Sequence, residues 1–147
     1  MKRFTTIISA LSILGACGCS TLPQVRDGAY VGFEFMPGYT DPVNPKAKWY
    51  HENRLAICGN SVTIEKVPIT IEDGKKCYSA SDGGFYTFKG TIESTNDQLL
   101  LRLKLVDSCY VMRKADGSDV NRIYSGRINQ DGSLEINKVH YDVKKKE

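Results

Sequence analysis

Few residues of this sequence suggest catalysis or metal binding by their type and spacing. The chain contains two histidines, His51 and His140, and neither stands at ligand spacing from the other or from a cysteine. The patterns H-x-x-H, C-x-x-C and G-x-S-x-G are absent, and so is a phosphate-binding loop. Because metal and hydrolase sites are usually marked by such patterns, we expect no metal, no cofactor and no enzymatic activity.

The cysteines are the remaining reactive residues, and Cys17 closes a distinctive N-terminal segment. Lys2 and Arg3 give this segment a positive start, and residues 4–15 carry no charge and are mostly apolar. About twenty apolar residues are needed to cross a bilayer core, and this run is shorter. A basic start, a short apolar run and small residues before a cleavage point indicate a secretory signal peptide.

The segment Leu14-Gly15-Ala16-Cys17 resembles the lipobox of bacterial lipoproteins. The resemblance implies that residues 1–16 are removed and that Cys17 carries a diacylglyceryl group and an acylated amine. Gly18 is not the Asp with which this family retains proteins in the inner membrane. We therefore expect an anchor in the cell envelope, in the outer membrane facing the periplasm. The alternative is an ordinary signal peptide cleaved near Ala16, which leaves Cys17 free to pair with Cys19.

Export to an oxidising compartment favours a disulfide among the other four cysteines. Four thiols allow three connectivities, and sequence alone does not choose among them. Counting strand directions along the chain predicts that Cys58 and Cys109 share one end of the sheet and that Cys77 starts near the other end. This count favours a Cys58–Cys109 bridge, because a disulfide needs Cα atoms within about 7 Å of each other.

Aromatic residues mark a candidate contact surface around the longest connection of the domain, residues 37–48. This connection contains three prolines and no periodicity, and loops of this length often carry function. Tyr39, Trp49 and Tyr50 could form a binding surface there. The competing interpretation is that Trp49 closes an open end of the core as an amphipathic plug.

A second candidate lies in the segment Ser79-Ala-Ser-Asp-Gly-Gly-Phe-Tyr86. It resembles the Ser-Ala-Ser-Gly…Tyr segment of membrane-bound C-type lysozyme inhibitors, which are lipoproteins with a small barrel that insert a loop into the lysozyme cleft. The resemblance implies binding roles for Ser81, Asp82 and Tyr86. Asp82 interrupts the family's Ser-Gly pair, and a hairpin turn around Asp-Gly-Gly explains the same residues through turn chemistry.

The elements that must position these residues are β-strands. Residues 99–105 alternate Leu99, Leu101, Leu103 and Leu105 with Leu100, Arg102 and Lys104, which predicts a half-buried strand. Residues 30–36 alternate as a first strand. The dipeptides Gly59-Asn60 and Asp73-Gly74 predict hairpin turns. Pro68 lies within a strand-like run and predicts that this strand is an edge or is broken.

A weak internal repeat supports a meander of similar hairpins. Gly90 and Gly126 occupy equivalent places in its two copies, and we expect these glycines at turns. No amphipathic helical window is present. The chain is therefore expected to be all-β, an antiparallel meander of about eight to nine strands that closes into a small barrel or a strongly curled sandwich. Its expected parts are the signal peptide 1–16, a lipidated tether 17–27, the β domain 28–143 and a charged tail 144–147.

Charge and composition restrict the possible functions. The chain carries 20 Lys and Arg against 17 Asp and Glu, and two of its basic residues lie in the leader. Such a balance gives no strong field for nucleic acid. Two classes remain: a membrane-anchored module that binds or inhibits another envelope protein, and a lipocalin-like carrier of a small apolar ligand. A carrier needs an interior cavity, whereas a protein-binding module should be filled and expose aromatic residues.

Overall fold

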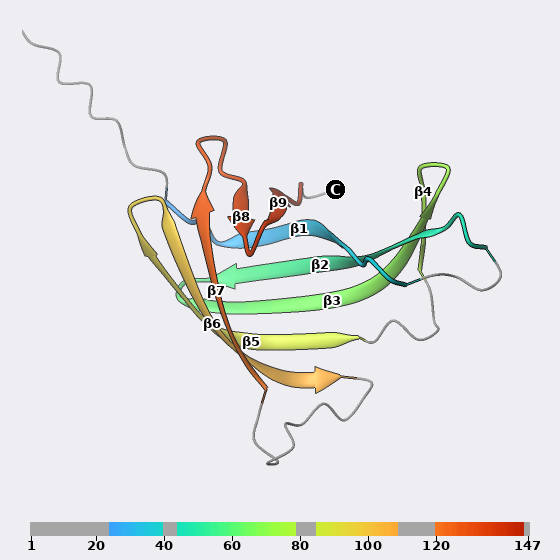
Figure 1. The fold of residues 1–147 in the computed structure, drawn as a ribbon. Coiled ribbons are helices and arrows are strands. Elements are labelled where there is room, and N and C mark those ends of the chain that lie inside the picture. Colours follow the sequence, from blue (N-terminus) through green and yellow to red (C-terminus); the bar gives the residue numbers. More distant parts are fainter. Residues whose placement is uncertain (1–23, 40–43, 79–84, 109–119, 146–147) are drawn as a thin grey trace, which may run out of the picture.

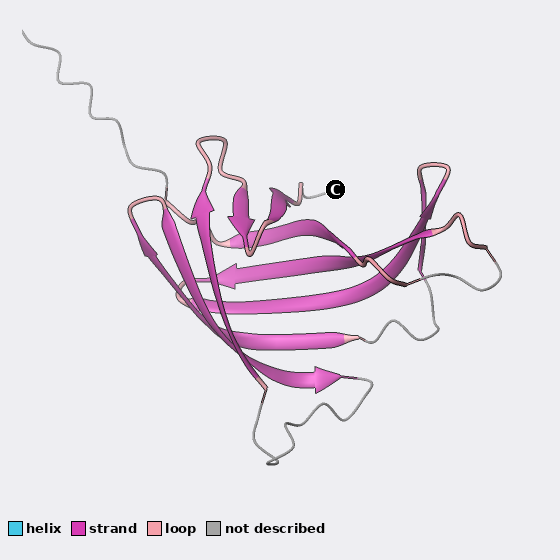
Figure 2. Cartoon of the chain, in the orientation of Figure 1, coloured by secondary structure: helices cyan, strands magenta, loops and turns pink. Residues whose placement is uncertain are grey.

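The computed structural model describes residues 24–39, 44–78, 85–108 and 120–145, and these residues form strands and turns (Figures 1 and 2). The strands pair antiparallel throughout. They are β1 (Gly28–Phe35), β2 (Lys48–Cys58), β3 (Ser61–Glu72), β4 (Lys75–Tyr78), β5 (Tyr86–Thr95), β6 (Gln98–Ser108), β7 (Asn121–Ile128), β8 (Leu134–Ile136) and β9 (Val139–Val143).

Eight of these strands close into a barrel. The order is β2-β1-β9-β8-β7-β6-β5-β3, and β2 also pairs with β3, which completes the ring. The ninth strand, β4, adds to the outer part of β3 and lies outside the ring. Closure removes most of the exposed strand edges that an open sheet would present. The prediction of an all-β meander that forms a small barrel is confirmed.

The hairpin turns follow the local sequence. Cys58 pairs with Ser61 across Gly59-Asn60, and Gly59 has a φ of 56°. Glu72 pairs with Lys75 across Asp73-Gly74, where both turn residues have positive φ, 47° and 76°. Asp-Gly favours this mirror-image turn, whose twist matches that of the flanking strands. Both predicted turns are confirmed.

Pro68 has a different role from the expected one. Strand β3 continues through it without a break and pairs with β2 along its whole length, with Pro68 opposite His51. On the other side, β3 pairs with β5 up to Lys66 and with β4 from Ile69 onward. Pro68 therefore lies at the change of neighbour, where no ladder hydrogen bond is lost, and the prediction of an edge or broken strand is wrong.

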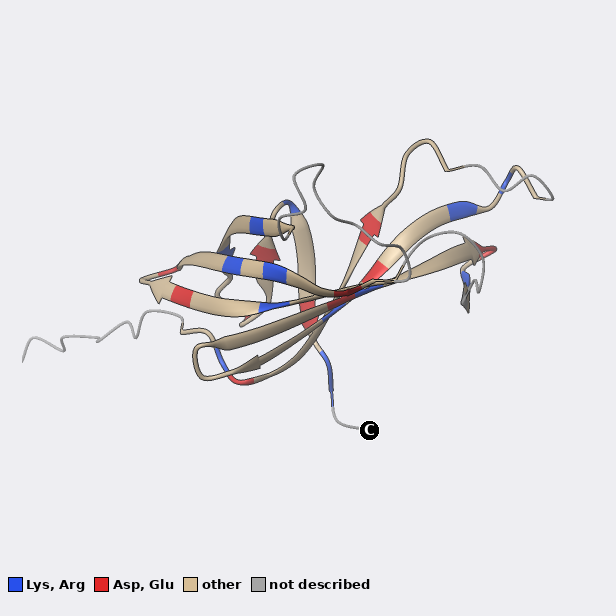
Figure 3. Ribbon diagram, turned by 90° about the horizontal axis from the view of Figure 1, so that it is seen from below, with Lys and Arg blue, Asp and Glu red and all other residues tan. Residues whose placement is uncertain are grey.

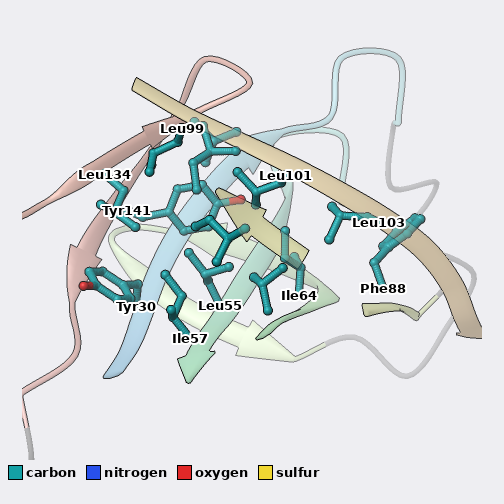
Figure 4. Packing of buried hydrophobic residues seen from close by; sticks show 14 of the residues in the cluster. Tyr30, Leu55, Ile57, Ile64, Phe88, Leu99, Leu101, Leu103, Leu134 and Tyr141 are labelled. Atoms are coloured by element: carbon teal, nitrogen blue, oxygen red, sulfur yellow. The ribbon is translucent and has the colours of Figure 1, made fainter. Parts of the chain in front are cut away.

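The interior of the ring is packed with apolar side chains from all eight barrel strands (Figure 4). Leu101, Ile64, Leu134 and Ile136 are completely buried. The alternation at 99–105 places Leu99, Leu101 and Leu103 inward and leaves Arg102 and Lys104 exposed, as predicted. The cluster comprises Tyr30, Leu55, Ile57, Val62, Ile64, Phe88, Ile92, Leu99, Leu101, Leu103, Ile128, Leu134, Ile136, Val139 and Tyr141.

Three glycines allow neighbouring strands to approach closely, in place of the turn role expected for two of them. Gly90 lies within β5 and Gly126 within β7, and neither has positive φ. A Cβ on Gly90 would lie 1.8 Å from the backbone oxygen of Arg102, and one on Gly126 would lie 2.3 Å from that of Glu135. Gly32 meets β9 in the same way. Glycine at these places permits the close backbone approach and sharp curvature of a small barrel.

The barrel has two different ends (Figure 1). At one, which we call the turn end, β1 begins, β9 ends, and the tight turns Gly59-Asn60 and 96–97 join β2 to β3 and β5 to β6. Asp27 accepts a hydrogen bond from Gly59 N there, at 2.8 Å. At the other, which we call the loop end, β1 and β6 end and β2, β5 and β7 begin.

The described strands place Cys58 and Ser108, the residue before Cys109, at different levels of the barrel, and the Cys58–Cys109 bridge itself stays a prediction. Ser108, the residue before Cys109, pairs with Tyr86, which pairs with Lys66 at the level of Asn53. Cys58 lies five positions further along β2, about 17 Å at ~3.4 Å per residue. The strand count that favours this bridge treats the segment after Asp73-Gly74 as a full descent of the barrel, whereas β4 has only four residues. Cys109 itself lies outside the described residues. Cys58 and Cys77 are free and exposed.

Candidate functional site

A layer of polar side chains lies on the inner face of the barrel next to the loop end. Lys66 Nζ on β3 lies 2.6 Å from Glu34 Oε2 on β1. Asn53 Nδ2 on β2 donates to the same carboxylate at 3.4 Å and to the Tyr141 hydroxyl on β9 at 3.3 Å. Asn53 and Tyr141 are almost completely buried. We call these four residues the polar layer, and they link four strands above the apolar core.

Burial and pairing set the ionisation of this layer. Burial disfavours the charged form of Glu34, but the hydrogen bond and the charge of Lys66 outweigh it and lower the pKa of Glu34. Burial also raises the pKa of Tyr141 far above its ordinary value. At neutral pH Glu34 is therefore ionised and the phenol of Tyr141 is neutral.

Aromatic rings surround the polar layer. His51 on β2 meets Tyr86 on β5 edge to face, with ring centroids 5.9 Å apart. Lys66 Nζ lies 6.0 Å from the centroid of Tyr124. Within the described part of the chain, Trp49 Nε1 and Asn53 Oδ1 are buried without a hydrogen-bond partner. Both belong to the inner face of β2, so the unsatisfied polar atoms of this region lie toward the loop end.

A groove runs over the outer face of β1, β2 and β3. It encloses about 550 Å³. Its floor is made of small side chains in register, with Ala29 opposite Ala56 and Ala56 opposite Thr63. Phe33, which is 44% exposed, stands at one side. The lining residues are Ala29, Tyr30, Val31, Phe33, Glu52, Arg54, Leu55, Ala56, Thr63, Glu65, Lys76 and Lys144.

A charged cluster organises this outer groove. Glu52 is only 4% exposed and forms salt bridges with Arg54, at 2.8 Å, and with Lys76 on β4. Burial opposes ionisation of Glu52, but the hydrogen bonds from Lys76 and Arg54 outweigh it and lower its pKa. Lys76 Nζ also lies 5.4 Å from the ring centroid of Phe33. Lys76 of β4 thus forms part of the groove lining, between Glu52 and Phe33.

The aromatic residues expected around the long connection lie on different faces. Trp49 is 7% exposed, and Tyr39 contacts it with ring centroids 6.1 Å apart. Tyr50 follows Trp49 on β2 and so points to the opposite face, where it lies 5.4 Å from Phe35. The structure therefore brings Tyr39 and Trp49 together and joins Tyr50 to Phe35. The burial of Trp49 agrees with the plug interpretation.

The other candidates are only partly within the described residues. Tyr86 is half-buried at the start of β5, against His51. Ser81, Asp82, Cys17 and Cys109 lie outside the described residues.

Sequence reasoning missed both the polar layer and the charged cluster. Each of the three polar residues stands two positions from an inward-facing residue of the same strand, on the side of the loop end. The pairs are Glu34 and Gly32, Asn53 and Leu55, and Lys66 and Ile64. A polar residue that continues an inward apolar series is a usable signal, but only once the inward face of each strand is known. Lys76 on β4 and Glu52 on β2 meet through tertiary structure alone, and no spacing in the sequence indicates their contact.

The described residues contain no group of three or more His, Cys, Asp and Glu side chains arranged to hold a metal ion. They also contain no helix long and apolar enough to cross a membrane. Charged residues are spread over many strands and turns, with no single large block of either sign (Figure 3). Comparison with protein-family models, curated proteins and solved structures found no significant match to this chain.

Proposed function

We propose that this protein is a lipid-anchored module of the bacterial cell envelope that binds another envelope protein through the outer groove. The observation that carries the proposal is the contrast between the two sides of the sheet. The interior is filled by a continuous apolar cluster, whereas the outer face of β1 exposes Phe33 and Phe35 beside a groove of about 550 Å³.

The lining of the groove suits a protein partner. Exposed aromatic rings give a binding surface most of its buried apolar area, and Arg is enriched at such surfaces together with them. Here Phe33 and Phe35 supply the rings, and Glu52 holds Arg54 and Lys76 in fixed positions. A partner therefore meets preorganised cations next to an apolar floor, which lowers the entropy lost on binding.

The position of the first strand supports the proposed anchor. Strand β1 begins at Gly28 at the turn end, so a lipid on Cys17 attaches the barrel to the membrane by this end. The loop end, the exposed ring of Phe35 and the charged cluster then lie further from the membrane. Binding residues at this distance can reach partners in the periplasm.

The alternative of a lipocalin-like carrier requires an interior cavity. Leu101, Ile64 and Leu134 are fully buried in the middle of the barrel, so the apolar core favours the binding module. A function like that of the C-type lysozyme inhibitors rests on residues 79–86, of which Tyr86 is half-buried. Inhibition of lysozyme through that segment would use a different surface from the outer groove and is a separate alternative.

Site-specific crosslinking in cells tests the proposal. A photoreactive residue in place of Phe33 should crosslink the full-length protein to a defined envelope protein. The same residue at Thr91, which is exposed on β5, is the matched control and should give no such product. Equal products from Phe33 and Thr91 would refute binding through the groove. So would the absence of any product from a photoreactive residue at Phe33 and, in a second variant, at Phe35. A small apolar molecule that copurifies in native mass spectrometry would support the carrier.

A further inference from the structure

Between β7 and β1 the barrel wall consists of two short strands, β8 and β9, which do not extend to the loop end. Strands β8 and β9 have three and five residues, and their connecting turn, Asn137-Lys138, bonds to Ser125 through Asn137 N at 2.9 Å. Strand β7 pairs with β8 only over Gly126–Ile128, and β1 pairs with β9 only as far as Gly32. Above this turn, β7 and β1 are separated by the width of two missing strands, about 14 Å between them at ~4.8 Å per spacing.

The hydrogen-bonding groups on this edge of β7 can be assigned from its neighbours. Val120 O accepts from Leu105 N, and Ile128 N donates to Asp97 O, so the even-numbered residues of β7 bond toward β6. The odd-numbered residues point to the other side, and Ser125 O accepts from Asn137 N there. Ile123 therefore presents both its N–H and its C=O to the gap. Among the described residues, no strand lies opposite it.

Side chains along this edge add charge and apolar surface. Ile123 points outward and is 65% exposed. Arg122, on the inward-facing side at the loop end, is exposed, and its Nη1 donates to Asn121 O at 3.2 Å. Lys138 is exposed at the β8–β9 turn. Neither cation forms a salt bridge within the described part of the chain. The gap thus combines an open strand edge with two cations.

A buried acceptor lies deeper in the same end of the barrel. Asn53 is 1% exposed, and its Oδ1 has no hydrogen-bond partner among the described residues. Its amide nitrogen bonds to Tyr141 of β9, the strand that stops short at this gap. A buried unsatisfied acceptor costs free energy and is normally paired.

We propose that the free edge of β7 binds an extended, acidic peptide segment of a partner protein by strand addition. The backbone of the segment pairs with Ile123 and completes the wall where β8 and β9 stop short. Side chains of an added strand alternate, so acidic residues face inward to Arg122 while apolar residues lie outward beside Ile123. Strand β1 is the less suitable edge because inward-facing Glu34 would repel the acid. The inference does not depend on the outer groove.

Hydrogen exchange and titration with a named probe test this proposal on the full-length chain. The probe is a capped heptapeptide of alternating Glu and Val. Without it, the amide of Ile123 should exchange faster than that of Tyr124, which bonds to β6. The probe should slow exchange at Ile123, and Arg122→Ala should weaken its binding at least tenfold. Arg26→Ala, an exposed arginine just before β1 at the turn end, is the matched control and should change binding less than twofold.

Three results would overturn strand addition at β7. The first is equal binding of a peptide with Lys in place of Glu. The second is equal binding of a peptide whose valines are N-methylated, because those amides supply the bonds to Ile123. The third is strong protection of Ile123 without any probe, which would mean that another part of the chain or a second copy already covers the edge. Circular dichroism of each variant distinguishes lost binding from lost fold.

Discussion

Lys66 Nζ and Glu34 Oε2 lie 2.6 Å apart inside the barrel, on strands that are not neighbours. Strand β2 separates β1 from β3, and its Asn53 donates to the same carboxylate. The pair therefore reaches across an intervening strand and fixes the distance between β1 and β3 from the inside.

This ion pair should contribute to stability through coupling. Lys66→Met leaves the carboxylate of Glu34 without its main partner, and we expect a loss of about 1–3 kcal/mol in the free energy of unfolding. Glu34→Gln combined with Lys66→Met should cost less than the sum of the two single changes. Denaturant melts of the four proteins measure the coupling. Strictly additive effects would show that the pair contributes nothing.

Acid should destabilise the fold through Glu34 and Glu52. The folded-state pKa of each is lowered, so their stabilisation is fully present above the ordinary carboxyl pKa near 4.5 and is lost as the pH falls through the lowered value. The melting temperature should therefore fall as the pH is lowered below about 4.5. Glu52→Gln should flatten this decrease, whereas Glu93→Gln, at an exposed carboxylate, should leave it unchanged. Identical pH profiles of the two variants would contradict the assignment.

The two faces of β6 should respond differently to truncation. Leu101 is fully buried, and Leu101→Ala should cost about 2–5 kcal/mol in the free energy of unfolding. Arg102 is exposed, and Arg102→Ala should stay within about 0.5 kcal/mol. Urea denaturation followed by tryptophan fluorescence measures both, because the chain has a single tryptophan.

Gly90 should tolerate no side chain. A Cβ there would lie 1.8 Å from the carbonyl oxygen of Arg102, and the obstacle is backbone that cannot rotate away. We expect Gly90→Ala to destabilise the barrel by about 1–3 kcal/mol or more. Thr91→Ala, at the exposed neighbouring position, is the control and should have little effect. A mild Gly90→Ala variant would mean that β5 and β6 separate easily.

Lipidation of Cys17 remains a prediction from the sequence. Cys17→Ala should abolish membrane association and leave a precursor that is uncut or wrongly cut. Metabolic labelling with a fatty-acid probe, followed by membrane fractionation, measures both effects. Cys19→Ala is the control and should be labelled normally. Unchanged labelling of Cys17→Ala would exclude the lipobox assignment.

The features that the sequence predicted correctly depend on neighbouring residues. The alternation around Leu101 and the turn at Gly59-Asn60 are local, so the strand, its inward face and the hairpin follow from a few positions. The inward face of β1 is harder to predict, because Tyr30 and Phe33 are both aromatic and lie on opposite faces. Close packing decides it: Gly32 must face the backbone of β9, since a Cβ there would lie 2.5 Å from His140 O.

The features that could not be predicted depend on strand length and tertiary contact. The position of Cys58 relative to Ser108 changes with the length of β4, and no local pattern separates a four-residue strand from a full crossing of the barrel. The polar layer combines Glu34, Asn53 and Lys66 from three strands, so the sequence shows three isolated polar residues. Their partnership follows only from the register of β1, β2 and β3.

The pairing of β1 with β9 makes the first and last strands of the domain neighbours, with Lys144 N bonded to Ala29 O at 2.8 Å. The ring therefore cannot close until the last strand of the chain is available. A chain that lacks β9 keeps an open sheet whose exposed edge on β1 can pair with other chains. Closure also depends on contacts between residues far apart in the sequence, and such contacts slow folding. Truncation at the C-terminus should therefore cause aggregation, even though the residues it removes lie far from the outer groove.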